Sequence, residues 1–358
     1  MSQAIFLTGF PGFLGSELVV RLLERYPSEV SLACLVQSKF WPLAEQRVAD
    51  LEKQHPQWAG RIQLFNGDIT VANLGLEPKL SQRLQAEIVE IYHLAAIYDL
   101  GVTRPLGLRV NVEGTRFMLG FAEGSPNLRR FHYISTCYVS GRYKGLFRET
   151  DLDKGQTFNN YYEETKYLAE VAVQERMAQG LPITIYRPAI VQGDSRTGAT
   201  QKYDGLYYLL RWIMRQPRWA LVPVLGNPRH YEVNLVPSDF VVEAITYLSG
   251  LEQSKGKVYQ LCDPHPLTVE QLLKLVAQAT AHRLIRLPLP AALAQTVLKK
   301  IPGLRRFTGI EPEAFNYFTH PTVYSCEETM RDLAGSGISC PSYADYISLL
   351  ISFLREHW

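Results

Sequence analysis

Thr8-Gly9-Phe10-Pro11-Gly12-Phe13-Leu14-Gly15 lies close to the start of the chain and decides its fold. The apolar run over 4–7 suits a buried parallel strand, and apolar residues after the turn recur at helical spacing as far as Leu23. A strand, a glycine-rich turn and a helix in this order are typical of a dinucleotide-binding unit. The glycines allow a tight turn and let the backbone approach a pyrophosphate at the positive end of the helix. The alternative is a glycine loop that only reverses the chain.

Strands and helices alternate through the first half of the chain, as in a doubly wound parallel sheet. Strands are predicted over 30–36, 61–65, 88–92, 129–135 and 183–186, and helices over 39–53, 104–123 and 161–179. The predicted fold class is therefore α/β, a Rossmann sheet with a smaller C-terminal substrate lobe. We expect the dinucleotide-binding domain over 1–192, with returns near 231–262 that include sheet residues over 232–241 and a strand over 257–261. The remaining segments, 193–230 and 263–358, are assigned to the substrate-binding lobe.

Composition narrows the class of protein. The chain has 358 residues and a formal net charge of +2, so we expect no nucleic-acid partner. Its five cysteines form no C-x-x-C pair, which favours reduced thiols in a cytoplasmic protein and no metal site. No secretory signal is visible, and no run approaches the roughly 18 apolar residues of a membrane span. We expect a cytoplasmic enzyme without a transmembrane segment.

A second pair of motifs carries the chemistry. Ser135-Thr136-Cys137-Tyr138 is followed by Tyr162-Glu163-Glu164-Thr165-Lys166. Hydride transfer to a carbonyl requires a proton donor, and a tyrosine with a pKa of about 10 is a poor one near neutrality. A lysine four residues later lies on the same helical face and favours the phenolate. We therefore predict Tyr162 as the general acid and Lys166 as its electrostatic partner, which also bonds the nicotinamide ribose. Tyr161 competes for the acid role but lies on another face.

Together these motifs resemble the extended short-chain dehydrogenase/reductase family. The resemblance covers TGFPGFLG, GDI, HLAA, NVEGT, STCYVSG, YEETK and YRPAIV, and STCYVSG with RPAIVQGDSRTG is most similar to the fatty acyl-CoA reductase and carrier-protein thioester reductase branch. It implies that Thr136 hydrogen-bonds the substrate carbonyl while Ser135 turns inward, and we interpret Cys137 as a small buried hydrophobe. It also implies that Asp68 and Ile69 contact the adenine. Further cofactor contacts are expected from Gly9, Gly12, Phe13, Leu14, Gly15, Leu94, Ala95, Ala96, Tyr162, Lys166 and Pro188.

The end of the second strand bears on the choice of cofactor. NAD sites usually place an acidic residue there for the ribose 2′-hydroxyl, and this chain has none in Leu35-Val36-Gln37-Ser38-Lys39. The absence favours NADP, with NAD as the alternative. The similar reductases commonly carry arginine at the position of Gln37, whereas Arg47 matches a second basic position of their pattern. Lys39 is expected to assist.

The substrate is predicted from the resemblance and from an aromatic stretch. Tyr203, Tyr207, Tyr208, Trp212 and Trp219 either form an apolar cleft wall or belong to the core of the lobe. The leading hypothesis is an NADPH-dependent reductase that converts a small-molecule or carrier-bound acyl thioester to an aldehyde, or onward to an alcohol. The alternatives on this fold are a sugar-nucleotide epimerase or dehydratase, a hydroxysteroid-type dehydrogenase, and a non-catalytic dinucleotide sensor. A sugar-nucleotide substrate would need basic residues to bind its diphosphate, and the candidates are Arg187, Arg211, Arg215, Arg218 and Arg229.

Two further interactions are expected. The apolar and basic stretch over 291–307 suits contact with a membrane surface or an acidic carrier protein, or a solvated basic face on a packed helix. The family resemblance also predicts a homodimer in which the helices over 104–123 and 161–179 pair across a two-fold axis. The expected contact residues are Leu119, Ala122, Leu168 and Ala172.

Overall fold

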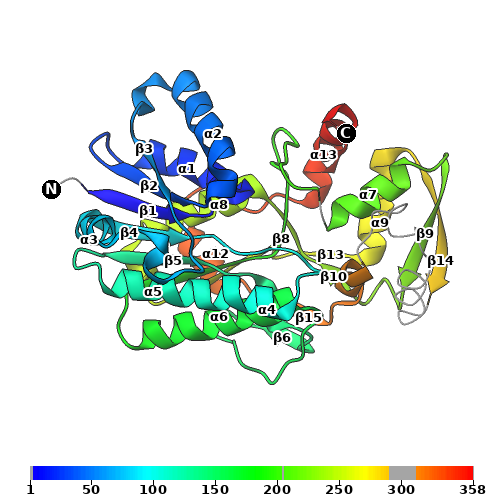
Figure 1. The fold of residues 1–358 in the computed structure, drawn as a ribbon. Coiled ribbons are helices and arrows are strands. Elements are labelled where there is room, and N and C mark those ends of the chain that lie inside the picture. The colour runs from blue at the N-terminus through cyan, green and yellow to red at the C-terminus, as the bar shows by residue number, and fades with distance from the viewer. Residues whose placement is uncertain (1–2, 204, 290–311, 358) are drawn as a thin grey trace.

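In a computed structural model, which describes residues 3–203, 205–289 and 312–357, a seven-stranded parallel sheet forms the centre of the molecule (Figure 1). Its strand order is β12-β7-β5-β4-β1-β2-β3. The order reverses beside β1, and ligands of such sheets bind at the carboxyl ends of the strands near this point. The predicted fold class is confirmed. The strands are β1 (Ala4–Thr8), β2 (Ser31–Val36), β3 (Ile62–Asn66), β4 (Ile88–His93), β5 (Arg130–Ile134), β7 (Ile183–Pro188) and β12 (Val258–Leu261).

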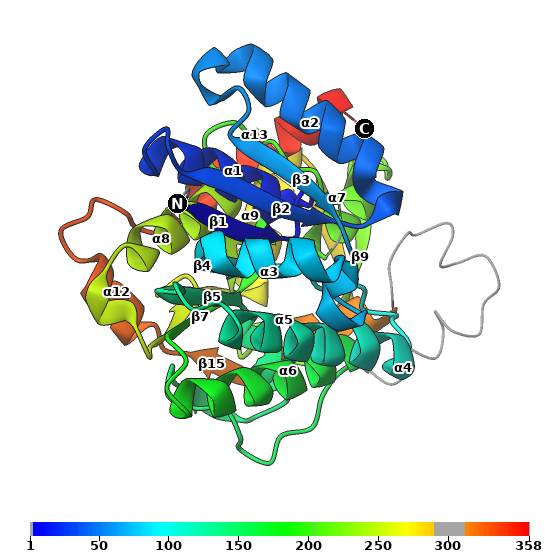
Figure 2. The ribbon, with the colours of Figure 1, turned by 60° about the vertical axis from the view of Figure 1, so that its left-hand side comes forward.

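Helices cover both faces of the sheet because its strands are apolar on both sides. In β1, Ile5 and Leu7 join one hydrophobic cluster, whereas Phe6 joins the other. The first cluster includes residues of α1 (Phe13–Arg25), α2 (Trp41–Gln54) and α8 (Ser238–Ser249). The second includes α3 (Pro78–Glu87), α5 (Gly114–Glu123) and α6 (Tyr161–Ala178). Figure 2 shows α5 and α6 side by side, with the sheet between them and the pair α1 and α2. Short turns of helix lie at η1 (Ser38–Phe40), η2 (Pro56–Trp58), η3 (Ala72–Gly75), η5 (Cys137–Ser140), η6 (Glu252–Ser254) and η7 (Pro312–Thr319).

Two elements differ from the sequence prediction. The helix expected over 104–123 contains a π-helical turn, η4 (Leu108–Glu113), between α4 (Arg104–Gly107) and α5. Within this turn the Asn111 amide accepts a hydrogen bond from the Ile97 backbone N–H at 2.9 Å and donates one to Thr165 Oγ1 at 3.0 Å. Such turns occur where a helix aims a side chain at a functional site.

The stretch 232–241, predicted to return to the sheet, does not do so. It forms β10 (Glu232–Val233) and β11 (Leu235–Pro237), and then the first turn of α8. β11 pairs in parallel with β8 (Ile190–Gln192) in a separate two-stranded sheet. The apolar run suited a strand as well as a buried helix, and packing of α8 on α1 decided between them.

The smaller lobe has its own hydrophobic cluster and occupies the right-hand side of Figure 1. Its parallel pair of strands, β9 and β14, lies beside helices α7 and α9 (Figure 1). The bounds are α7 (Leu206–Met214), β9 (Trp219–Leu225), β13 (Leu267–Thr268), α9 (Val269–Thr280), β14 (Arg283–Leu289) and α13 (Tyr343–His357). The segment 322–333, which the sequence assigned to the lobe, instead packs beside the central sheet. There β15 (Thr322–Tyr324) pairs with β6 (Gly145–Phe147), and α12 (Glu327–Leu333) contacts β12 and α8.

A buried carboxylate connects the segment 322–333 to the sheet. Glu149, just after β6, accepts hydrogen bonds from three backbone N–H groups, those of Gln260, Glu328 and Thr329, at 3.1, 2.6 and 2.9 Å. The Thr329 hydroxyl donates a fourth bond, at 2.6 Å. A buried charge is tolerated when hydrogen bonds satisfy it in this way. Glu149 therefore holds together three parts of the chain that are far apart in sequence.

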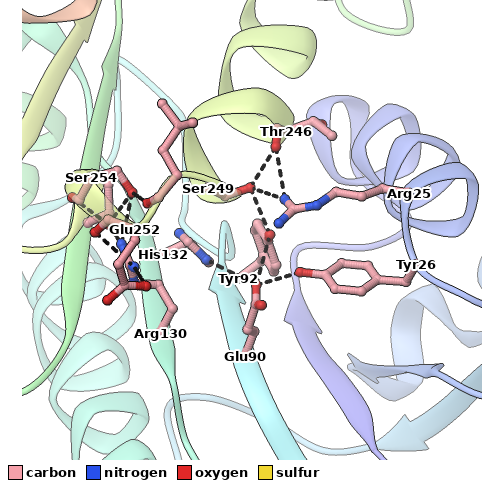
Figure 3. A network of polar contacts seen from close by, with 12 residues as sticks. Arg25, Tyr26, Glu90, Tyr92, Arg130, His132, Thr246, Ser249, Glu252 and Ser254 are labelled. Atoms are coloured by element: carbon pink, nitrogen blue, oxygen red, sulfur yellow. Dashed lines mark hydrogen bonds and ion pairs between the residues drawn. The ribbon is translucent and has the colours of Figure 1, made fainter. Parts of the chain in front are cut away.

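A polar network joins α1, β4, β5 and α8 toward the amino-terminal ends of the strands, away from their carboxyl ends (Figure 3). The Tyr26 hydroxyl donates to Glu90 at 2.6 Å, and a ring nitrogen of His132 lies 3.3 Å from the same carboxylate. Although burial opposes the effect, these partners lower the pKa of Glu90 below its usual value. Arg25 reaches the Ser249 hydroxyl at 2.7 Å. The network fixes the helix ends here and lies away from the ligand-binding edge.

Two further expectations can be compared with the fold. Leu119, Ala122 and Ala172, expected at a dimer interface, are buried in the chain's own core, and Leu168 packs against that core. Leu119, Ala122 and Ala172 therefore cannot form an interface between subunits, whereas Leu168 remains partly accessible. The basic stretch over 291–307 lies outside the described residues. Among the helices that the structure describes, none combines the length and the apolar character needed to cross a bilayer.

Candidate active site

A cavity of about 570 Å³ opens at the carboxyl ends of the strands and reaches into the lobe. One end lies at the glycine-rich turn and the other beside Tyr162, so a dinucleotide and a second ligand would meet within it. The structure brings most of the predicted site residues to its walls. These are Gly9, Gly12, Phe13, Leu14, Gly15, Arg47, Leu94, Ala96, Thr136, Tyr162, Lys166 and Pro188.

Five predicted cofactor residues do not line this cavity. The Gln37 side chain donates a hydrogen bond to the Asp68 carboxylate, which also accepts one from the Thr70 backbone N–H at 2.8 Å. Burial alone would raise the pKa of Asp68, but these bonds lower it below its usual value. Lys39 places its ammonium 4.7 Å from the ring centroid of Phe40. Of the other two, Ile69 packs against Gly114 of α5, and the Ala95 backbone N–H donates to Thr8 Oγ1 at 3.1 Å.

The glycines of the turn lie so close to neighbouring atoms that a side chain at these positions would clash. Gly9 has a φ of +98°, which favours glycine, and a Cβ there would lie 2.8 Å from that of Leu94. A Cβ on Gly15 would lie 2.5 Å from the Gly9 carbonyl oxygen, which accepts the Gly12 N–H at 2.8 Å. Bare backbone therefore faces the cavity where α1 begins. This cradle fits the pyrophosphate of a dinucleotide.

Tyr162 reaches the cavity from the first turn of α6. The helix begins at Tyr161 because Asn160 caps it, its side chain accepting the Glu163 backbone N–H at 3.0 Å. Tyr162 is only 7% exposed and lines the cavity, with its ring 4.8 Å from that of Tyr98 in an edge-to-face arrangement. Tyr161 is 48% exposed and lies outside. Only one of the two adjacent tyrosines can meet a bound ligand.

Lys166 lies one turn further along α6. Its ammonium donates to the Tyr133 hydroxyl at 3.0 Å and to the Ile134 carbonyl at 2.8 Å. Burial lowers the pKa of Lys166 to about 7, although the nearby Glu170 carboxylate acts in the opposite direction. His93 is neighbouring but uncharged, because burial and the charge of Lys166 lower its pKa to about 3. Lys166 is thus only partly charged near neutral pH, and an anionic ligand would favour its charged form.

The residues that follow β5 divide between the cavity and the core. Thr136 lines the cavity, with its hydroxyl 3.4 Å from the Pro188 carbonyl and accepting the Tyr138 N–H at 3.3 Å. Ser135 also lines the cavity, but its hydroxyl donates to the buried Glu170 carboxylate. Cys137 is fully buried and its thiol faces the Arg187 carbonyl at 3.0 Å, as expected of a small hydrophobe. Thr136 is the hydroxyl placed to meet a substrate.

Arg187, considered above for a diphosphate, is a core residue. Both Arg187 and Glu170 have 0% exposed side chains, and Arg187 Nε and Nη2 lie 3.0 and 2.5 Å from Glu170 Oε1. Its remaining donors reach the backbone carbonyls of residues 148, 149 and 151. A side chain so fully paired cannot bind a ligand.

The expected aromatic wall belongs to the lobe. Tyr207 is buried in its core and accepts the Gly193 N–H at 2.8 Å, and the Trp212 indole donates to the Leu221 carbonyl at 2.8 Å. Trp219 is 54% exposed on β9. None of the five aromatics between Tyr203 and Trp219 lines the cavity, and Tyr208 lines a small pocket beside it that shares Gly205 and Phe318 with it, so the cleft interpretation is wrong for the other four.

A different aromatic set lines the cavity, and sequence reasoning missed it. Tyr98 follows β4, Tyr138 follows β5, and Tyr317 and Phe318 come from η7. Rings of Tyr138 and Tyr317 pack edge to face, 4.8 Å apart. Only Tyr138 stood within a recognised motif. Arg47, Lys166 and Lys202 are the charged residues among the described lining residues, which include no carboxylate, and no metal-ligand cluster occurs in the described ranges.

Comparison with known proteins assigns the family. A family model of NAD-binding domains, described as male sterility protein, matches residues 7–245, well over half of the chain. The chain belongs to this family. The terminal R domain from the myxalamid PKS-NRPS biosynthetic pathway is 29% identical and superimposes with a TM-score of 0.82, covering 99% of this chain and 91% of that one.

Two curated relatives are much longer than their matching regions. A linear gramicidin synthase of Brevibacillus parabrevis is 26% identical over 76% of this chain, which spans 5% of that protein. Fatty acyl-CoA reductase wat of Drosophila melanogaster is 26% identical over 68% of this chain and 53% of its own length. These matches confirm the resemblance to extended short-chain dehydrogenases/reductases and to their acyl-CoA and carrier-protein thioester reductase branch. A nicotinamide dinucleotide is therefore the cofactor that proteins of this family bind.

Proposed function

We propose that the protein is an NADPH-dependent reductase of acyl thioesters, with an aldehyde as the first product. One observation carries the proposal: Thr136, Tyr162 and Lys166 line a single cavity that begins at the glycine-rich turn and ends among aromatic side chains. The relatives named as an R domain and as a fatty acyl-CoA reductase support the same substrate class. A non-catalytic sensor would not need a proton donor in this position.

The chain's own residues can manage the proton. A reduced nicotinamide cofactor bound at the glycine-rich turn would supply a hydride to the thioester carbonyl carbon. The Thr136 hydroxyl would hydrogen-bond the carbonyl oxygen, and Tyr162 would donate its proton to that oxygen as charge develops. Tyr162 then takes the proton back while the C=O bond re-forms and the C–S bond breaks. The departing thiolate takes up a proton from the solvent, which leaves an aldehyde and a thiol.

The buried ammonium of Lys166 would stabilise the Tyr162 phenolate between these two steps. Lys166 now bonds Tyr133 and Ile134, so its predicted contact with the nicotinamide ribose remains part of the proposal. A second hydride transfer to the aldehyde at the same residues would give an alcohol. The apolar and aromatic walls around Tyr162 suit an acyl chain better than a sugar.

We infer NADPH rather than NADH from the charges at the other end of the cavity. Arg47 lies there, beside the first turn of α1, and the described lining residues include no carboxylate that would bind a ribose 2′-hydroxyl. An arginine can bind a 2′-phosphate through two N–H groups at once. Gln37 and Lys39 lie outside the cavity, so the proposed selectivity depends mainly on Arg47.

A sugar-nucleotide substrate is less well supported. Arg187 is buried in its pair with Glu170, and Arg229 makes an exposed ion pair with Glu270 at 2.9 Å. The other arginines proposed for a diphosphate, Arg211, Arg215 and Arg218, do not line the cavity.

Stoichiometry of turnover tests the proposal. The purified protein is given NADPH with acyl-CoAs, carrier-bound acyl thioesters, aldehydes, sterols and sugar nucleotides, and both NADPH oxidation and free thiol are measured. One thiol released for each NADPH consumed indicates an aldehyde product, and one thiol for every two NADPH indicates an alcohol. Turnover of a sugar nucleotide without net NADPH use, together with no thiol release from any thioester, would refute the proposal.

We also propose a cytoplasmic homodimer. The five cysteines are free thiols, as expected in a reducing compartment. The outward-facing side chains Leu106 of α4 and Phe117 of α5 are exposed apolar groups on the helices expected to pair. Light scattering that shows a monomer at all micromolar concentrations would contradict the dimer.

A further inference from the structure

One loop of the lobe ends at the wall of the cavity. We call residues 194–202 the strap. Its base is fixed: the Asp194 N–H donates to the Ala199 carbonyl at 2.9 Å, and the Ser195 hydroxyl donates to Asp239 of α8 at 2.6 Å. Its last two residues, Gln201 and Lys202, both line the cavity. The strap therefore has an anchored base, and its last two residues lie at the ligand site.

Gln201 contacts the cofactor side of the cavity. Its side-chain oxygen accepts a hydrogen bond from Arg47 Nη2 at 2.6 Å, across 154 positions of sequence. Arg47 Nη1 donates to the Ser16 hydroxyl in α1 at 2.5 Å. The guanidinium is thus held between the beginning of α1 and the strap. Both of its partners are neutral oxygen acceptors, which a phosphate oxygen could replace.

Lys202 contacts the substrate side of the cavity. Its ammonium lies 3.3 Å from the ring centroid of Tyr98, a close cation–π contact. The Tyr98 ring in turn packs against that of Tyr162. Two adjacent residues of the strap therefore touch the arginine proposed for the cofactor and the wall beside the proposed acid.

We propose that Gln201 is a positioning residue of the 2′-phosphate site and that the strap couples this phosphate to the substrate side of the cavity. The inference rests on the proposed binding of NADPH at Arg47. When a 2′-phosphate takes the place of the Gln201 oxygen on Arg47, the Gln201 amide rotates and donates its N–H₂ group to the phosphate. The end of the strap then stays at the cavity wall, with Lys202 against Tyr98. With NADH, which lacks this phosphate, only the direct hydrogen bond between Arg47 and Gln201 fastens this end of the strap.

Cofactor binding tests the first half of the inference without any acyl substrate. Calorimetry measures the affinity for NADPH, NADH and adenosine 2′,5′-bisphosphate in the wild type, Gln201→Glu and Gln201→Ala, with exposed Gln253→Glu as a control for charge. Glutamate can only accept hydrogen bonds and repels a phosphate, so Gln201→Glu should weaken both 2′-phosphate ligands about tenfold or more. Its affinity for NADH should change less than about twofold, and Gln201→Ala should show a smaller loss of the same selectivity.

Each of the other possible outcomes contradicts either the inference or the NADPH proposal on which it rests. Equal losses for NADPH and NADH in Gln201→Glu would place Arg47 and Gln201 at the pyrophosphate and refute the inference. Unchanged affinities in a wild type that prefers NADPH would refute the inference and leave the NADPH proposal standing. A wild type that binds NADPH and NADH equally would refute both.

Steady-state kinetics test the coupling. The KM for the acyl thioester should be lower with saturating NADPH than with saturating NADH in the wild type. This difference should disappear in Gln201→Ala and in Lys202→Ala, because either change interrupts the path from Arg47 to Tyr98. A difference that persists in both variants would show that the strap does not connect the two sides.

Discussion

Replacing Arg187 with methionine should destabilise the protein strongly. Methionine fills a similar length of buried space but removes every hydrogen bond that the guanidinium makes. The Glu170 carboxylate would remain in the core with 0% exposure, and three backbone carbonyls would lose a donor. Breaking a buried ion pair by removing one partner costs about 3–5 kcal/mol. Because domains have a free energy of unfolding of about 5–15 kcal/mol, this loss is a large part of the total.

Urea unfolding followed by tryptophan fluorescence measures the loss. The control is Arg176→Met, which removes an ion pair with Glu123 whose side chains are both nearly half exposed. That change should cost at most about 1 kcal/mol. The double variant Arg187→Met with Glu170→Met should recover much of the loss, since no unpaired charge is left in the core. An Arg187→Met protein as stable as the Arg176→Met control would refute this reasoning.

Three further predictions concern the site. Tyr162→Phe should abolish turnover of NADPH while calorimetry still detects cofactor binding, and exposed Tyr161→Phe should retain most activity; the reverse result would reassign the acid. Burial raises the pKa of Glu163 from 4.5 to about 7, so the folded state holds this proton more tightly than the unfolded state and loses stability as the pH rises through this window. Glu163→Gln should therefore raise the melting temperature above pH 7 more than below pH 4.5, and an equal change at both would contradict the assignment. Binding of the anionic cofactor should raise the pKa of Lys166 from about 7, giving proton uptake above neutral pH in calorimetry with different buffers; no uptake would count against its place beside the cofactor.

The parts of the fold that depend on local pattern could be predicted from the sequence. Gly9, Gly12 and Gly15 follow an apolar strand and precede an amphipathic helix, so the turn and its neighbours follow from spacing alone. The four-residue separation of Tyr162 and Lys166 likewise placed both on one face of α6 and in one cavity. Such relations involve neighbours in sequence, and the backbone geometry of one element decides them.

The rest depends on contacts between distant segments. No local pattern distinguishes Tyr98 and Tyr317, which line the cavity, from Tyr207, which is buried in the lobe. The π-helical turn arises because Asn111 bonds Ile97 and Thr165, and a continuous helix fitted the same sequence equally well. Gln201 meets Arg47 only after the lobe has packed on the sheet. A pairing across 154 residues leaves no periodic signal.

The position of Glu149 has a consequence for how the protein is made. The carboxylate receives its donors from residues 260, 328 and 329, and β7 gains its outer neighbour only from Val258–Leu261. While the ribosome is still synthesising the lobe, the emerging nucleotide-binding half therefore has an open sheet edge and an unsatisfied acid. Open edges of this kind invite pairing with other chains. The nucleotide-binding half can complete its folding only after residue 329 has left the ribosome, and a fragment that stops at residue 245 should aggregate.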